Sequence, residues 1–206
     1  MHQRILLAPV SALTAAMLFA CGGTGDDPGA APTPTATSGP ATVTAGPHNT
    51  IDIEFAQMMI PHHQQAVQMA DLAAGRAADP RVTQLAAAIR AAQQPEIATM
   101  TGWLTSWAQP TTMPGMPSGH SGHDMGGGAM PGMMSEADMT TLEALSGTEF
   151  DRSFLTLMVA HHNGAVDMAR SEQREGRYPP ALALARSIQA GQTAEIRVMK
   201  QILGSL

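Results

Sequence analysis

The sequence contains one stretch of residues twice. Residues 55–70 read FAQMMIPHHQQAVQMA and residues 154–169 read FLTLMVAHHNGAVDMA, so equivalent positions lie 99 residues apart. Both copies keep a Phe, a Met, a His-His pair, and the Ala-Val and Met-Ala pairs, and both follow an acid, Asp52 or Asp151. A repeat that served packing alone would keep only apolar residues. This repeat also keeps His and Met, which are ligands for soft and borderline metal ions.

The repeat continues into the next segment, and its unit is a helical hairpin. The matching positions in the first copy, each repeated 99 residues later, are Ile89, Gln93, Glu96, Ile97, Met100 and Leu104. With only 3% aromatic residues and 16 Met, the core must consist of Ala, Leu, Ile, Val and Met, a composition that favours helices. Two such hairpins predict an all-α, antiparallel four-helix bundle, which buries both apolar faces.

Capping residues and prolines mark the ends of the predicted helices. Asp79 and Pro80 fit an N-cap and a first helical position, and Ser135 with Asp138 three residues later fits a capping box. The bundle domain is therefore residues 49–206: a first hairpin (49–108), a loop (109–134) and a second hairpin with a short leading helix (135–206). The predicted helices are residues 49–75, 80–107, 135–146, 148–176 and 179–203.

The first 48 residues are predicted to be a signal and a tether. Residues 1–20 contain Arg4 and an apolar run too short to span a membrane, followed by Cys21. This pattern resembles a bacterial lipoprotein signal in which Cys21 is lipidated, although Phe19 departs from the usual small residue. An ordinary secretory signal cut near Ala20 is the alternative. Residues 21–48, rich in Gly, Pro and Thr, predict a flexible tether, so we expect an extracytoplasmic protein, lipid-anchored or secreted.

Charge and cysteine content narrow the classes of function. The formal net charge of −6 gives no indication of nucleic-acid binding through a basic patch. Cys21 is the only Cys of the sequence, so no internal disulfide forms, and lipidation would remove its thiolate as a metal ligand. Hydrolase motifs with a Ser or Cys nucleophile or a zinc-binding His pair are absent. The sequence leaves a homo-oligomer open.

Two His-His pairs fall on or beside the predicted inward seams of the first and third long helices. On each seam the first His follows a Met by three residues, so the two side chains lie one helical turn apart. The second His of each pair lies about 100° further round the helix, at the edge of the seam. The candidate metal ligands of the bundle are His62, His63, His161, His162, Met59, Met158, Met69 and Met168.

Each of the other two long helices carries one carboxylate on its predicted seam. A small residue precedes the acid by four positions in both copies: Ala92 and Glu96, and Gly191 and Glu195. An unpaired buried carboxylate is costly, so each Glu is expected to meet a His on the facing helix. In one interpretation Glu96 and Glu195 are metal ligands or orient a His ligand. In the other, His62–Glu96 and His161–Glu195 are hydrogen-bonded pairs that only fix the register of the bundle.

Residues 109–134 break all helical periodicity and are rich in Met, His, Gly and Pro. Met has no packing reason to cluster in a loop. Thioether and imidazole without thiolate suit Cu(I) or Ag(I), and imidazole also suits Cu(II). Compositional drift in a spacer is the alternative. The candidate loop ligands are His120, His123, Met113, Met116, Met125, Met130, Met133 and Met134.

The motif MMIPHHQQAVQMA resembles the signature of the bacterial "domain of unknown function 305" family. QQPEI and MTGWL resemble the second-helix pattern of that family, and MVAHHNGAVDMA is similar to a second copy of the motif. The resemblance covers residues 49–203 apart from the loop. It implies a ferritin-like helical bundle in secreted or lipid-anchored proteins, some of which are associated with copper binding and tolerance. Carried over by position, the ligands it implies are His62, His63, His161, His162, Met59 and Met158.

The two copies differ beside the His pairs. Pro61 is matched by Ala160, and Gln64-Gln65 by Asn163-Gly164. These departures leave the equivalence of the two halves open.

Three functions are compatible with these observations. The leading hypothesis is sequestration or homeostasis of copper or silver ions, without catalysis. A ferritin-like di-iron or di-manganese oxidase is the second, but such sites need Glu-x-x-His motifs. Met59 and Met158 stand where that motif requires Glu. The third is a metal-free structural or partner-binding bundle.

Overall fold

The computed structural model describes residues 46–112 and 130–206, which form helices joined by short loops. The helices are α1 (Thr50–Ala73), α2 (Pro80–Ser106), α3 (Glu136–Ala144), α4 (Gly147–Glu175) and α5 (Pro179–Leu203). The predicted all-α class, with two helical hairpins and a short additional helix, is confirmed. The predicted signal, the tether up to residue 45 including Cys21, and loop residues 113–129 lie outside the described residues.

The helix ends follow the local signals. Asn49 and Ser135 each form a capping box with the acid three residues later, and Asp79 caps α2 ahead of Pro80. α4 begins one residue before the predicted start, at Gly147. Gly147 has a φ of +66°, which glycine adopts without strain, and its N–H donates to the Arg76 carbonyl at 2.7 Å. This bond joins the two interhelical loops at one end of the bundle.

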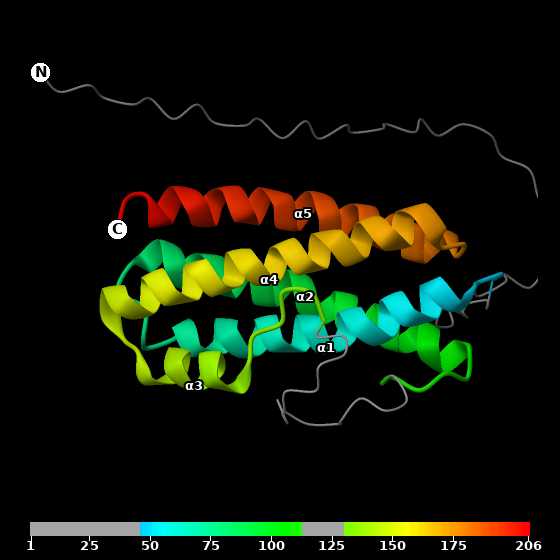
Figure 1. Ribbon diagram of the computed structural model, residues 1–206, viewed down its shortest axis with the longest axis horizontal. Helices are drawn as coiled ribbons and strands as arrows, with labels where there is room; N and C mark the ends of the chain where they lie inside the picture. The colour runs from blue at the N-terminus through cyan, green and yellow to red at the C-terminus, as the bar shows by residue number, and fades with distance from the viewer. Residues whose placement is uncertain (1–45, 113–129) are drawn as a thin grey trace, which may run out of the picture. The chain divides into compact units, whose positions relative to one another are not determined.

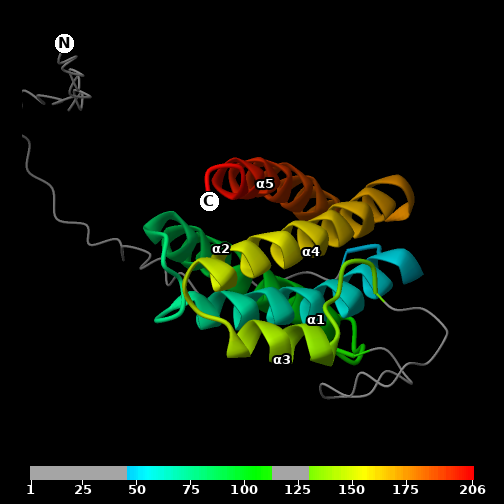
Figure 2. The same ribbon diagram turned by 60° about the vertical axis from the view of Figure 1, so that its left-hand side comes forward.

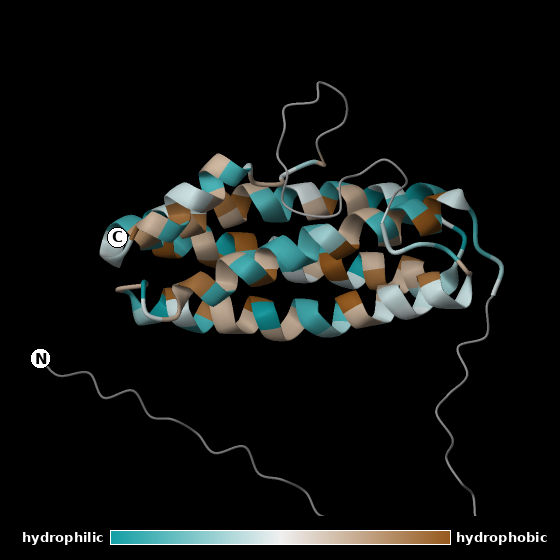
Figure 3. Cartoon of the chain, turned by 90° about the horizontal axis from the view of Figure 1, so that it is seen from below, coloured by the Kyte–Doolittle hydropathy of each residue, from teal (hydrophilic) through white to brown (hydrophobic). Residues whose placement is uncertain are grey.

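The long helices pack as two hairpins, α1 with α2 and α4 with α5. The hairpins meet mainly through α1 and α4, which lie side by side in both Figure 1 and Figure 2, while α2 and α5 touch much less. Hydrophobic and hydrophilic residues alternate along each helix in Figure 3, as expected for helices with one buried face. No helix in the described part of the chain is long and apolar enough to span a membrane.

Two buried aspartates lock the hairpins together. Asp151, near the start of α4, accepts hydrogen bonds from the N–H groups of Ala78 (3.2 Å) and Asp79 (2.9 Å), just before α2. Asp52, near the start of α1, accepts from the N–H groups of Arg177 (3.0 Å) and Tyr178 (2.8 Å), just before α5. Each hairpin therefore supplies the acceptor for the turn of the other. The start of α4 meets the turn that follows α1, and the start of α1 meets the turn that follows α4. The two helices therefore run antiparallel.

One of these two locks carries a second acid. Glu172 is 1% exposed and lies against Asp52; its equivalent in the first copy is Ala73. Burial, together with the negative charge of the neighbouring Asp52, raises the pKa of Glu172 to about 8. Burial also opposes ionisation of Asp52, but the surrounding hydrogen bonds outweigh it and lower the pKa of Asp52. At neutral pH Glu172 is therefore mostly protonated, beside an ionised Asp52.

The lock predicts a stability effect that is specific to Asp151. Asp151→Asn replaces one oxygen of a fully buried side chain with an NH₂ group, which cannot accept from the N–H groups of Ala78 and Asp79, so we expect a loss of about 1–3 kcal/mol in the free energy of unfolding. Urea denaturation at neutral pH measures this loss. Asp167→Asn, on the exposed face of the same helix, is the matched control and should change stability by less than about 0.5 kcal/mol. Equal, small losses in both variants would show that the lock contributes nothing.

The Glu172–Asp52 pair predicts a pH dependence with a definite sign. Glu172 ionises near 4.5 in the unfolded chain but near 8 in the folded protein, so the unfolded state releases its proton first as the pH rises. The stability of the wild type should therefore fall relative to Glu172→Gln between pH 5 and pH 8. Urea denaturation across this range tests the sign, with Glu175→Gln, at the exposed end of the same helix, as control. Parallel profiles for wild type and Glu172→Gln contradict the assignment.

Candidate metal centre

Two imidazoles meet where α1 packs on α4. The ring centroids of His62 and His161 are 3.7 Å apart, with the ring planes inclined by 37°. Both residues have no exposed surface, and the same holds for His63 and His162 beside them. The prediction that His63 and His162 lie at the edge of the seam was therefore too cautious. All four imidazoles are removed from water.

Three of the imidazoles use Nε2 in a hydrogen bond. His63 pairs with Glu96 at 2.8 Å and His162 with Glu195 at 2.7 Å. His62 Nε2 lies 3.1 Å from the carbonyl oxygen of Pro131, which can only accept, so Nε2 carries the proton. The predicted pairs His62–Glu96 and His161–Glu195 were wrong by one residue, because the glutamates lie nearer the second His of each pair.

The remaining imidazole nitrogens have no hydrogen-bond partner among the described residues. They are the four Nδ1 atoms and, for His161, Nε2 as well. A buried polar atom without a partner is costly, by about 1–3 kcal/mol. In a neutral imidazole whose Nε2 donates, Nδ1 carries the lone pair and can bind a metal ion.

The His62 and His161 imidazoles are held in the neutral form. Burial, aided by the nearby His63, lowers the pKa of His62 to about 3. Burial and the other three imidazoles also lower the pKa of His161 well below its ordinary value. Both rings therefore keep a lone pair available at neutral pH, which metal ligation requires.

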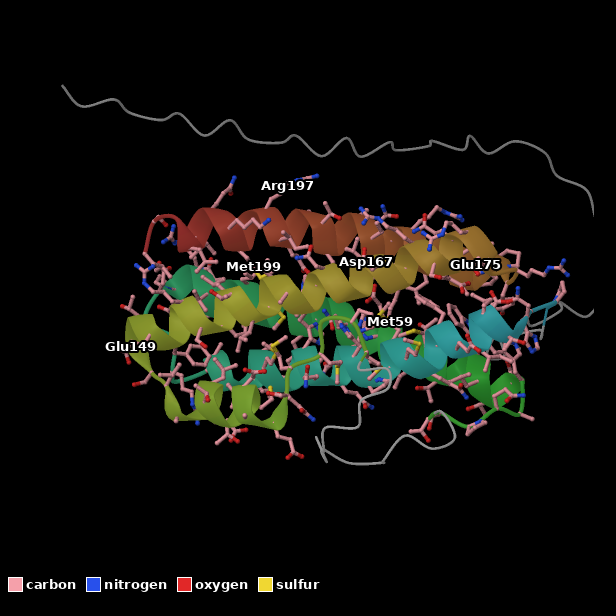
Figure 4. All side chains as sticks on the ribbon, viewed as in Figure 1. Met59, Glu149, Asp167, Glu175, Arg197 and Met199 are labelled. Carbon is pink, nitrogen blue, oxygen red and sulfur yellow. The ribbon has the colours of Figure 1, made fainter. Side chains whose placement is uncertain are left out.

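Buried methionines fill the core in two groups related by the repeat. Each group draws one Met from three different helices, and none of these residues is more than 8% exposed. One core cluster contains Met59, Met100 and Met168, and the other contains Met158, Met199 and Met69. Figure 4 shows Met199 pointing between the helices while Arg197, on the same helix, points away. Met100 and Met199 were visible in the repeat but were not predicted as ligands.

Two buried glutamines also went unrecognised. The side-chain amides of Gln93 and Gln192 have no partner among the described residues, although both residues are at most 3% exposed. The seams of α2 and α5 pass through these glutamines, whereas Ala92 and Gly191, which lie one turn before the glutamates, are exposed. The repeat had marked Gln93 and Gln192 as equivalent, and that signal could have found them.

Acidic and imidazole groups alone do not build a closed site. Within residues 46–112 and 130–206, no three His, Asp or Glu side chains are arranged to hold one metal ion. Glu96 and Glu195 are instead placed to orient His63 and His162.

Only the two ends of the Met/His-rich loop, residues 109–112 and 130–134, belong to the described chain. Met130 and Met133 are half-buried, and Met134 packs against the core cluster that contains Met158. The other predicted loop ligands, His120, His123, Met113, Met116 and Met125, lie outside the described residues.

Comparison with known proteins identifies the family. Residues 52–203 match the family model described as "Domain of unknown function (DUF305)". The chain belongs to the DUF305 family. No match was found among curated proteins.

Solved structures of DUF305 proteins share the fold. A Streptomyces coelicolor protein described as a secreted DUF305 protein is 35% identical, with 75% of this chain and 93% of that chain covered and a TM-score of 0.67. A DUF305 fragment from Deinococcus radiodurans is 34% identical, with 78% and 100% covered and a TM-score of 0.67. CopM in its Cu(II)-bound form is 34% identical, with 75% and 96% covered and a TM-score of 0.63. CopM has also been solved with Cu(I) and with silver bound.

The buried imidazoles predict an unusual titration. Because the folded pKa of His62 lies far below that of the unfolded chain, near 6.5, His62 should show no titration between pH 7.5 and pH 5. The unfolded state takes up a proton first, so this group makes the protein less stable as the pH falls below 6.5. Imidazole ¹⁵N spectra of the metal-free protein measure the titration. A midpoint near 6.5 for His62 would contradict its burial in neutral form.

Proposed function

We propose that this protein binds a soft metal ion, Cu(I) or Ag(I), outside the cytoplasm, with His and Met side chains of the bundle core as ligands. One observation carries the proposal. Four fully buried imidazoles have Nδ1 atoms without a partner among the described residues, in a core that also contains buried methionines.

The hydrogen bonds made by Nε2 support this role. Histidine ligands of metal ions usually donate their second nitrogen to a carboxylate or a backbone carbonyl, which fixes the tautomer and orients the ring. Glu96 and Glu195 stand in that relation to His63 and His162, and Pro131 to His62. We assign the two glutamates to this orienting role.

The chemistry of the donor set favours copper(I) or silver(I) over iron. Thioethers are soft ligands, whereas an oxygen-activating di-iron site needs several carboxylates. Glu96 and Glu195 are the carboxylates beside the imidazoles, and each accepts a hydrogen bond from a His. We therefore propose binding and storage or transfer of the ion, with no catalysed reaction.

The relatives support the metal and the compartment. CopM, similar over 75% of this chain, is known in Cu(I)-, Cu(II)- and Ag-bound forms, and the Streptomyces relative is described as secreted. We propose the same compartment for this protein, with Cys21 as the lipid-anchored residue and the membrane as its attachment. The loop would capture ions loosely and pass them to the core.

A competition experiment with a Cu(I) chelator tests the proposal. The wild type should compete for Cu(I), and the double variant His62→Ala/His161→Ala should lose about 10- to 100-fold or more in affinity, because two ligands are removed. Met59→Leu/Met158→Leu keeps the core filled and should weaken Cu(I) binding as well. His48→Ala is the matched control: His48 precedes α1, is only half-buried and stacks on Trp107, with ring centroids 4.3 Å apart, so the variant should keep wild-type affinity.

Other results would favour the alternatives. Iron retention with oxygen consumption would indicate a di-iron oxidase. Wild-type affinity in both double variants would place the ion outside the core. Absence of binding of Cu(I), Ag(I) and Cu(II) would leave a structural bundle.

A further inference from the structure

A short segment ahead of α3 crosses the α1–α4 pair at the imidazoles. This strap, residues 131–134, lies across both helices in Figure 1 and Figure 2. Its Pro131 carbonyl accepts the hydrogen bond from His62 Nε2. Gln65 clamps its other end, because the Gln65 amide donates to the Met134 carbonyl at 2.9 Å and accepts from the Met134 N–H at 2.8 Å. The strap is thus fixed to α1 at two points.

On α4 the strap packs directly against the helix backbone at Gly164, which has no side chain. A Cβ at Gly164 would lie 1.9 Å from the Pro131 carbonyl oxygen and 2.9 Å from the Cα of Gly132. Gly132 itself has a φ of +79°, and a Cβ there would lie 2.7 Å from the Ala160 carbonyl oxygen. Two glycines, one on each side of the contact, therefore allow the strap to touch the α4 backbone.

The residues that hold the strap lie where the two copies of the repeat differ. Gln65 and Gly164 occupy equivalent positions, 99 residues apart. Gln65 forms the hydrogen bonds to the strap, and Gly164 leaves the space that the strap backbone fills. The strap contacts both α1 and α4 beside the His62–His161 contact. Because one segment meets the two helices in different ways, the residues it meets at equivalent positions must differ. This explains why the two copies of the repeat differ here.

We propose that the strap is a positioning element of the metal centre, which fixes the Nε2–H tautomer of His62 and so presents its Nδ1 to the ion. His161 has no such partner among the described residues, since both of its nitrogens are without one. The two halves of the centre are therefore unequal: the strap sets His62 in advance to bind through Nδ1, and no strap contact does the same for His161. The effect of the strap on metal binding rests on the proposed function. Its effect on the His62 tautomer does not, because the tautomer is a property of the metal-free protein.

Gly164→Ala tests the strap without changing any proposed ligand. The added methyl group collides with backbone atoms of Pro131, which cannot rotate away, so the strap must lift. Gly191→Ala is the matched control: it is also a helical glycine, and its Cβ would meet nothing within 4 Å. Gln65→Ala, which removes the clamp, is the second variant in case Gly164→Ala does not fold, with its exposed neighbour Gln64→Ala as control.

Two measurements separate positioning from metal binding. Imidazole ¹⁵N spectra of the metal-free full chain should show His62 as the Nε2–H tautomer in the wild type and controls, and as a mixture in Gly164→Ala or Gln65→Ala. Competition with a chelator for Ag(I) should show a loss of about 10- to 100-fold in the same two variants, the usual effect of removing a partner that orients a ligand.

The outcomes are distinguishable. An unchanged His62 tautomer in both strap variants would overturn the inference, and so would a changed tautomer with wild-type affinity for Ag(I). If the tautomer changes but the wild type binds no Ag(I), the positioning role of the strap stands and the proposed function fails.

Discussion

The removal of four imidazoles from water is the constraint on which the rest of the structure depends. A buried ring needs a partner for each nitrogen, and the fold supplies three: Glu96, Glu195 and the Pro131 carbonyl. The five nitrogens left over are costly in a purely structural core. Their cost becomes intelligible if they serve as ligands, because a metal ion satisfies several lone pairs at once.

The antiparallel contact of α1 and α4 places the imidazoles opposite one another, and the aspartate locks hold that contact at both ends. Asp52 and Asp151 each cap the turn of the other hairpin, so the hairpins cannot slide without breaking these hydrogen bonds. The short His62–His161 contact is thus fixed from outside the site. Site geometry and bundle stability depend on the same acids, and neither acid belongs to the candidate ligand set.

Much of this arrangement could be predicted because the repeat reports it directly. A 99-residue offset that keeps His, Met and Asp implies two equivalent hairpins, and the capping residues placed the helix ends within a few residues. The pairing of Glu96 with His63 rather than His62 could not be predicted, because the apolar pattern does not decide which of two neighbouring residues, about 100° apart on the helix, faces the glutamate. The role of Gly164 also needed the structure, since the strap it admits comes from a distant segment.

Diffraction from a Cu(I)-loaded crystal, with anomalous scattering measured at the copper edge, tests the central claim most directly. The account predicts a copper peak inside the bundle within bonding distance, about 2.0–2.1 Å for a metal–nitrogen bond, of a His62 or His161 nitrogen, with methionine sulfur completing the coordination. Copper found only on the surface, with these nitrogens still unligated in the core, would contradict it.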